Sequence, residues 1–367
     1  MSTIGNVKHV FSGGNTSKGF YSYFDYILSQ EEAKRIFCIK GGPGTGKSNF
    51  MRRIATEFVN KGYDVELMHC SSDPNSLDGV VIKNIKVALL DGTAPHVVDP
   101  KTPGAVDEII NLGEYWEEEE ISKHKEEILK INAEISKIFA RAYKYIAAAK
   151  CIFDDIAVIN GEAMNQAGIY FEYQRVMDKE FRNIPFTLKP GRVRKLFASA
   201  ITPEGVINYL HTIVHSCHNI YVVKGAPGTG TEVLLDRILH EAIARGFYVE
   251  TYYCPMEPEK RVEHVIIPDL KLAFVTSNKY HQINENGALV IDLNHYLNKN
   301  IITQYADNLE YDQTTFDALI DKAVETIKGA KKAHDKLEKF YIGNMRFDEV
   351  QKCYEKTMEK ILKYAES

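Results

Sequence analysis

Hydrophobic and polar positions recur in a similar order in the two halves of the chain. Early in the sequence, an apolar run at Arg35–Lys40 predicts a buried strand, a glycine-rich loop follows it, and Lys47–Asn60 has the pattern of a helix. Residues 64–69 and 86–90 are expected to form further strands. This alternation of strands and helices predicts an α/β fold with a parallel sheet covered by helices. The glycine-rich loop then lies at the carboxyl edge of the sheet, where such folds bind ligands.

Long helices are expected in the later part of each half. In the first half, apolar side chains recur at steps of three and four at Ile121, Ile128, Ile131, Ile135, Ile138, Ala142, Tyr145 and Ala149. The second half repeats this at Phe316, Ile320, Ala323, Ile327, Ala330, His334, Leu337 and Tyr341. With further helical patterns near 154–181 and 347–364, each half is expected to form a helical hairpin packed along a heptad-like seam. Such a hairpin serves either as a stalk or as a lid or homo-oligomerisation arm.

An internal duplication explains this repetition. The loop that begins at Gly41 is repeated at Gly225, and Cys70 aligns with Cys254. After a one-residue shift, His96 aligns with His281. We therefore expect two tandem domains, residues 1–190 and 191–367, joined near Pro190-Gly191.

The first loop carries a complete phosphate-binding motif. Its sequence GGPGTGKS fits the pattern G-x-x-x-x-G-K-[ST], the Walker A motif or P-loop, between a predicted strand and a predicted helix. In such loops the backbone N–H groups surround a phosphate at a helix N-terminus. Lys47 is expected to contact the β- and γ-phosphates, and Ser48 to bind Mg²⁺. The predicted nucleotide-binding residues are Gly41, Gly42, Pro43, Gly44, Thr45, Gly46, Lys47, Ser48 and Asn49.

A second Mg²⁺ ligand is expected at Asp91, the carboxylate that ends the apolar strand Val87–Asp91. The corresponding residue of the second half is Thr276. Lys47 and Asp91 are therefore the predicted catalytic residues, and Ser48 and Asp91 the predicted metal ligands. ATP is the expected nucleotide, since the sequence has no guanine-specific Asn-Lys-x-Asp motif.

The general base is less evident, because Gly92 follows Asp91 where an Asp-Glu pair would supply a water-activating glutamate. Carboxylates and a histidine near strand ends are candidates: Glu66, Asp73, His96 and Asp99. Glu66 and His96 recur in the second half as Glu250 and His281, which favours structural roles for both.

The second loop keeps the turn residues and loses the phosphate chemistry. Thr231 replaces the lysine and Glu232 replaces the Mg²⁺-binding hydroxyl. With no lysine at 231 to offset it, the Glu232 carboxylate is expected to repel phosphate. We therefore expect one ATP per chain, bound in the first half, and a pseudo-active second half.

Two further polar segments have both a possible functional role and an ordinary structural one. In a glycine-rich stretch near the N-terminus, Asn15, Thr16 or Lys18 is expected near the working site; the alternative is an ordinary N-cap before a helix over residues 20–28. A cluster in the second half lacks the spacing of a structural zinc site, which favours a helix-to-strand connection at His211, His215, Cys217 and His218.

Composition narrows the class of protein. The 367 residues carry a formal net charge of -5, which argues against general nucleic-acid binding. No segment reaches the ~18 consecutive apolar residues of a membrane span, and the residues from Met1 to Lys8 do not have the apolar pattern expected of a signal segment. The six cysteines form no C-x-x-C pair, as in a cytoplasmic protein with reduced thiols.

Several stretches resemble an uncharacterised bacterial family of tandem P-loop proteins described as ATPases. They are FSGGNTSKGFYS at 11–22, KGGPGTGKS at 40–48, HCSSDPNSLDG at 69–79, DGTAPHVVDP at 91–100 and GAVDEIINLGEYW at 104–116. The resemblance covers the whole chain and implies a cytoplasmic nucleotide-binding protein, with no known client or acceptor. A Mg²⁺-dependent ATPase is the leading hypothesis. The alternatives are a kinase for a nucleoside or another small hydroxyl compound, and a nucleotide-gated binding module with negligible turnover.

Overall fold

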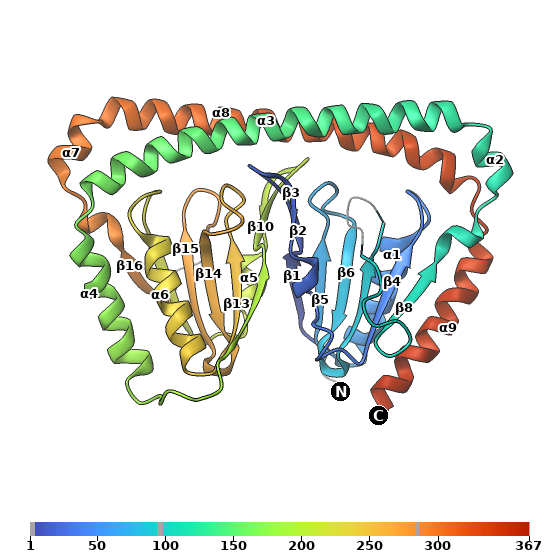
Figure 1. Ribbon diagram of the computed structural model, residues 1–367, viewed down its shortest axis with the longest axis horizontal. Helices are drawn as coiled ribbons and strands as arrows, with labels where there is room; N and C mark the ends of the chain where they lie inside the picture. Colours follow the sequence, from blue (N-terminus) through green and yellow to red (C-terminus); the bar gives the residue numbers. More distant parts are fainter. Residues whose placement is uncertain (1–3, 94–97, 284–285, 367) are drawn as a thin grey trace.

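Two six-stranded sheets lie side by side beneath a pair of long helices in the computed structural model of the chain (Figure 1). The structure describes residues 4–93, 98–283 and 286–366. The α/β class expected from the sequence is confirmed, with one sheet in each half. Among the described residues, no helix combines the length and apolar character needed to cross a membrane.

The first sheet has the strand order β1-β5-β6-β7-β4-β8. Its strands are β1 (Val7–Phe11), β4 (Arg35–Lys40), β5 (Val65–His69), β6 (Leu77–Ile82), β7 (Val87–Asp91) and β8 (Asp107–Asn111). The expected parallel sheet is confirmed in part: the sheet is mainly parallel, but β6 runs antiparallel to both of its neighbours. Only the short turn η2 (Lys83–Ile85) joins β6 to β7, and so short a connection cannot make the crossover that parallel strands need.

The second sheet repeats this topology in the order β9-β13-β14-β15-β12-β16. Its strands are β9 (Arg192–Leu196), β12 (Asn219–Lys224), β13 (Tyr248–Tyr253), β14 (Val262–Ile267), β15 (Leu272–Ser277) and β16 (Leu289–Asp292). As in the first half, its third strand, β14, is the antiparallel one. The repeated strand order matches the duplication inferred from the sequence.

A helix follows the glycine-rich loop in each half. These helices are α1 (Lys47–Asn60) and α6 (Thr231–Ala244), and the bounds of α1 agree with the prediction. Phe50, Ile54 and Phe58 of α1 are buried in the core that also contains Val80 and Ile82 of β6. The apolar face of α1 therefore holds the loop against the sheet.

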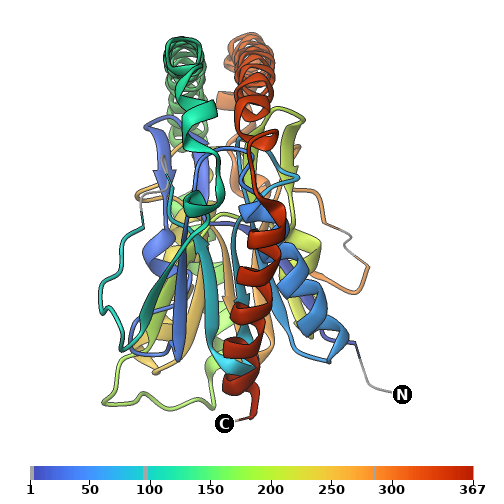
Figure 2. The same cartoon turned by 90° about the vertical axis from the view of Figure 1, so that its right-hand side faces the viewer.

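The long helices are exchanged between the halves. Helix α3 (Lys125–Ala163) starts above the first sheet and ends above the second, and α8 (Ala306–Ile342) runs back beside it (Figures 1 and 2). Their shared core joins Ala142 and Ile146 of α3 to Phe316 and Ile320 of α8. The hairpins expected within each half are therefore wrong. A helix of 39 residues is about 58 Å long, so α3 extends over both sheets rather than folding back on one.

The exchange also places the terminal helices. Helix α4 (Gln166–Val176) lies against the second half, whereas α9 (Phe347–Glu366), at the end of the chain, lies against the first (Figure 1). Tyr354 and Met358 of α9 belong to the same core as Phe50 of α1. Each sheet is thus completed by a helix that follows the long helix of the other half.

Two hairpins lie at the junction of the sheets. They are β2 (Gly13–Thr16) with β3 (Gly19–Ser22) and β10 (Ser199–Thr202) with β11 (Gly205–Asn208). The helix expected over residues 20–28 is wrong, since the chain there forms β3 and the short turn η1 (Phe24–Tyr26). Shorter helical segments are η3 (Leu112–Tyr115), α2 (Glu118–Ser122), η4 (Met177–Phe181), α5 (Leu210–Ile213), η5 (Pro268–Leu270), η6 (Leu293–Tyr296) and α7 (Lys299–Gln304).

Candidate functional site

The first glycine-rich loop connects β4 to α1 at the carboxyl edge of the first sheet. Gly44 and Gly46 have φ angles of 69° and 87°, in the left-handed region that favours glycine. Thr45 Oγ1 donates to the Gly42 carbonyl at 2.9 Å. Because α1 begins at Lys47, directly after this turn, its N-terminus faces the loop, as in phosphate-binding sites.

Three of the predicted site residues gather beside this loop. Lys47 Nζ donates to the carbonyls of Gly41 and Gly42 at 2.8 and 2.9 Å, and lies 3.7 Å from Asp91 Oδ2. Ser48 Oγ accepts a hydrogen bond from the N–H of Leu77, at the start of β6, at 3.0 Å. The structure thus brings together an ammonium and a hydroxyl from α1 and a carboxylate from the end of β7.

The Asp91 carboxylate is held by Thr93 in the following loop. Asp91 Oδ1 accepts the N–H of Thr93 at 2.9 Å, and Thr93 Oγ1 donates to the Gly41 carbonyl at 2.9 Å. Burial raises the pKa of Asp91, and the Lys47 charge opposes that rise. Thr93 therefore links the end of β7 to the glycine-rich loop, a role that the sequence reading did not assign.

Asp78 is a second buried carboxylate at the site, and the sequence reading missed it. Only 3% of Asp78 is exposed, and burial followed by the Asp91 charge raises its pKa well above the usual value. Since β6 is antiparallel, its first residues lie at the same edge as the last residues of β7, with Gly79 opposite Leu90. The sequence signal that could have identified Asp78 was the apolar run after Leu77-Asp78-Gly79, because this run predicts a strand that begins near Asp78.

The chemistry of these groups suits a hard divalent cation. Asp78 and Asp91 act on each other electrostatically, and Lys47 is a cation that acts on both. The raised pKa values of Asp78 and Asp91 show that ionising both beside one ammonium is unfavourable, and a bound cation would favour their ionised forms. Carboxylate and hydroxyl oxygens are the ligands that Mg²⁺ prefers. Ser48 and Asp91, with Asp78 beside them, could therefore hold Mg²⁺.

The end of α8, from the second half of the chain, covers the loop. A side chain at Gly42 would lie 3.1 Å from the Tyr341 ring and 3.2 Å from the Trp116 ring. A side chain at Gly44 would lie 2.7 Å from Ile342. Lys331 Nζ, farther back along α8, lies 3.3 Å from Asp73 Oδ2, in the loop between β5 and β6. The second half thus contributes one wall of the site.

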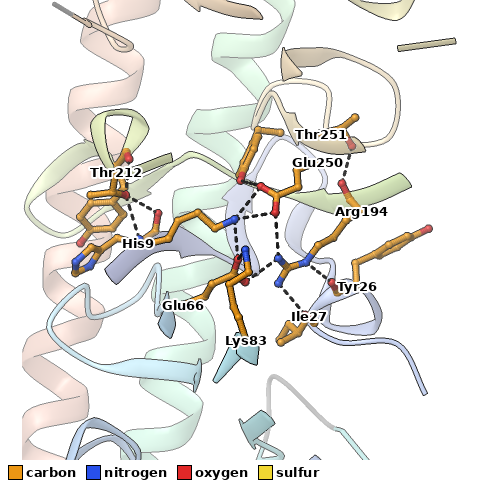
Figure 3. A network of polar contacts seen from close by, with 12 residues as sticks. His9, Tyr26, Ile27, Glu66, Lys83, Arg194, Thr212, Glu250 and Thr251 are labelled. Atoms are coloured by element: carbon orange, nitrogen blue, oxygen red, sulfur yellow. Dashed lines mark hydrogen bonds and ion pairs between the residues drawn. The ribbon is translucent and has the colours of Figure 1, made fainter. Parts of the chain in front are cut away.

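The candidate bases are dispersed. Glu66 lies in the middle of β5 and joins an ion cluster between the two halves, with Arg194 and Lys8 (Figure 3). Asp99 pairs with Lys40 Nζ at 2.7 Å. His96 lies outside the described residues. Asp73 is the candidate whose loop adjoins the site, and its Oδ2 accepts from Ser76 Oγ at 3.0 Å.

The N-terminal polar stretch contacts the second half instead of the first loop. Asn15 Nδ2 donates to the Ile201 carbonyl at 2.9 Å, and Lys18 Nζ lies 3.5 Å from Glu259. Thr16 Oγ1 donates to the Gly19 carbonyl within its own hairpin. These residues therefore join the two halves. The histidines and cysteine of residues 211–218 form no group of potential metal ligands within the described chain.

The second loop differs from the expectation in its charge. Arg261 Nη1 lies 3.1 Å from Glu232 Oε2, and Arg261 Nη2 donates to Thr231 Oγ1 at 3.3 Å. Residue 231 supplies no lysine to offset Glu232, as the sequence shows, but the loop before β14 supplies the Arg261 guanidinium, which the sequence did not predict. The loop is also covered by α3, whose Asn160 Nδ2 donates to the Pro227 carbonyl at 2.9 Å.

A cavity of about 400 Å³ adjoins this second loop. Its wall includes Gly225 and Arg261 from the degenerate site and Phe153 from α3. The second half thus retains a cavity beside the loop even though it lacks the lysine and hydroxyl of the phosphate-binding motif.

Comparison with known proteins yields no relative from which a function could be transferred. No protein-family model matches the chain, and neither a curated protein nor a solved structure matches it.

Proposed function

We propose that this protein is a Mg²⁺-dependent ATPase with one active site, in the first half of the chain. The observation that carries the proposal is the convergence of Lys47, Ser48 and Asp91 beside a glycine-rich loop at the N-terminus of α1. The second half, with Thr231 and Glu232 in the corresponding positions, is pseudo-active and supplies the cover formed by α8.

Each residue has a distinct role in this proposal. The loop N–H groups bind the β-phosphate, and Lys47 leaves the carbonyls of Gly41 and Gly42 to stabilise phosphoryl charge. Ser48 and Asp91 hold Mg²⁺, which when bound neutralises charge on the phosphates. Tyr341 and Ile342 limit the access of water to the loop, which strengthens the electrostatic interactions within it.

A small-molecule or nucleoside kinase is the second candidate. Gly92 stands where a water-activating glutamate would follow Asp91, and the cover over the loop favours transfer to a bound acceptor over transfer to water. A third candidate, a nucleotide-gated binding module, would keep the same contacts with negligible turnover. The client or acceptor does not follow from these residues.

The test compares Lys47→Ala with Thr231→Ala, the matched change in the degenerate loop. ATP affinity is measured by calorimetry, and phosphate release is followed over a range of Mg²⁺ concentrations. We expect Lys47→Ala to lower turnover by about 10²-fold or more, as for the loss of a group that stabilises transition-state charge. Thr231→Ala should leave turnover unchanged.

Further arms of this experiment separate the candidates. ATP-dependent phosphorylation of a member of a nucleoside panel would favour the kinase, and tight ATP binding without release or transfer would favour the binding module. Full ATP affinity together with full turnover in Lys47→Ala would overturn the assignment of the site.

A further inference from the structure

Three potential metal ligands gather in the second half, away from the proposed ATP site. Glu263 and His264 are consecutive residues of β14, and His281 lies in the loop after β15. All three are buried, with exposed fractions of 8%, 0% and 4%. One ligand atom of each lies within 4.8 Å of the others.

The two imidazoles have unsatisfied nitrogen atoms. Nε2 of His264 and Nδ1 of His281 are buried and have no hydrogen-bond partner among the described residues. Buried polar atoms in native proteins are nearly always paired, so both atoms indicate a missing partner. The other ring nitrogens are engaged, His264 Nδ1 with the Thr276 N–H at 3.2 Å and His281 Nε2 with Ser199 Oγ at 2.7 Å. His281 Nε2 also lies 3.5 Å from Glu263 Oε2. Such contacts commonly orient histidines that bind metals.

The corresponding positions of the first half have different chemistry. Asp78 and Gly79, the second and third residues of β6, align with Glu263 and His264, the second and third residues of β14. The first half thus offers carboxylates and a hydroxyl beside Lys47, whereas the second offers two imidazoles and one carboxylate. Oxygen ligands suit Mg²⁺, and the mixed nitrogen and oxygen set suits a transition metal such as Zn²⁺.

The cavity beside the degenerate loop gives this group access to solvent. Glu263 and His281 both line that cavity of about 400 Å³, so a water molecule or a ligand within it can supply a fourth coordination position. Three protein ligands with one open position are typical of catalytic zinc sites. At Zn–N and Zn–O distances of about 2.0–2.2 Å, tetrahedral ligands lie about 3.4 Å apart, so the side chains must approach one another as the ion binds.

We propose that the second half of this protein binds one Zn²⁺ ion, or a transition metal of similar preference, through Glu263, His264 and His281. The duplicated domain has then exchanged a Mg²⁺–phosphate site for a transition-metal site at the same edge of its sheet. The inference does not depend on ATP hydrolysis in the first half.

The test is a Zn²⁺ titration of the full chain after chelator treatment and without nucleotide, followed by calorimetry and by thermal unfolding. We expect one Zn²⁺ per chain and a higher melting temperature on binding. His264→Gln should lower the affinity at least tenfold and remove the thermal shift. The matched control is His334→Gln, which changes the exposed group His334, Asp335 and Glu338 on α8.

Each alternative result has a defined meaning. If unmodified protein binds no Zn²⁺, if His264→Gln binds as the unmodified protein does, or if His334→Gln alone abolishes binding, the proposal is overturned. Circular dichroism checks the folding of each variant, and Glu263→Gln replaces His264→Gln if the latter is unfolded. Co²⁺ in place of Zn²⁺ should give the visible absorption of a tetrahedral site in the unmodified protein, and its absence would also count against the proposal.

Discussion

The guanidinium of Arg194, in the second half, lies 2.7 Å from Glu66 Oε2 in the first half (Figure 3). The reciprocal pair joins Lys8 Nζ to Glu250 Oε2 at 2.8 Å. Lys8 stands opposite Glu66 in the register of the first sheet, and Arg194 stands opposite Glu250 in the second. Each half therefore contributes one buried cation and one carboxylate to a shared cluster, as in a symmetric dimer interface. Lys83 of the first half adds a half-exposed cation, 3.4 Å from Glu66 Oε1.

Replacing Glu66 should separate the effect of this cluster from that of surface charge. Glu66→Gln leaves Arg194 and Lys8 without one of their carboxylates, and removal of one partner from a buried pair costs about 3–5 kcal/mol. The control is Glu32→Gln, which removes the more exposed pair of Glu32 with Arg192 and should cost less than about 1 kcal/mol. Urea unfolding measures both, and equal losses would contradict a stabilising role for the cluster.

The pH dependence of the same pair has a definite sign. Burial alone would raise the pKa of Glu66, but Arg194 and Lys8 hold it well below its ordinary value of 4.5. The stabilisation by ionised Glu66 is therefore present above about pH 4.5 and is lost as the pH falls through the lowered pKa. The difference in unfolding free energy between the unmodified protein and Glu66→Gln should shrink over that acidic range. A difference that stays constant with pH would contradict this account.

Asp78→Asn should lower the activity of the protein and raise its stability. Burial and the Asp91 charge raise the Asp78 pKa, so its contribution to stability is present at low pH and is lost as the pH rises through that raised value. At neutral pH the amide should therefore raise the melting temperature while lowering Mg²⁺-dependent turnover. Asp25→Asn, at an exposed carboxylate, should change neither. Unchanged Mg²⁺ dependence in Asp78→Asn would remove this residue from the site.

Because the degenerate loop should not bind phosphate, we expect each chain to bind one ATP. Glu232 occupies the position of the Mg²⁺-binding hydroxyl and engages Arg261, so neither group is available to a phosphate. The double change Thr231→Lys with Glu232→Ser restores the motif and frees the guanidinium, and we expect a second, weaker ATP site in calorimetry. Two equivalent sites in the unmodified protein would show that the second half binds ATP as it is.

Lys331 tests whether α8 contributes to the first site. Its ammonium approaches Asp73 from the other half of the chain, and Lys331→Met should lower turnover roughly tenfold, equivalent to about 1.4 kcal/mol of barrier. Lys150→Met is the matched control, since Lys150 pairs with Asp154 on α3 as Lys331 pairs with Asp335 on α8. If the two changes lower kcat equally, the loss comes from a general effect on the long helices, and Lys331 has no specific role at the first site.

Short-range features were readable from the sequence alone. The strand Arg35–Lys40, the helix Lys47–Asn60 and the turn between them follow from local periodicity and from glycines at left-handed positions. The internal duplication was equally visible, because two copies of one pattern can be compared residue by residue. These features need no knowledge of distant contacts.

Tertiary structure decided which partners these elements meet. The apolar seams of α3 and α8 are alike, so periodicity could not distinguish a hairpin within one half from the exchange between halves. The direction of β6, and with it the meeting of Asp78 with Asp91, depends on the short turn between β6 and β7. Arg261 reaches Glu232 only because the loop before β14 returns to the start of α6. Contacts between distant residues come from how elements fold over one another, and local patterns do not encode that choice.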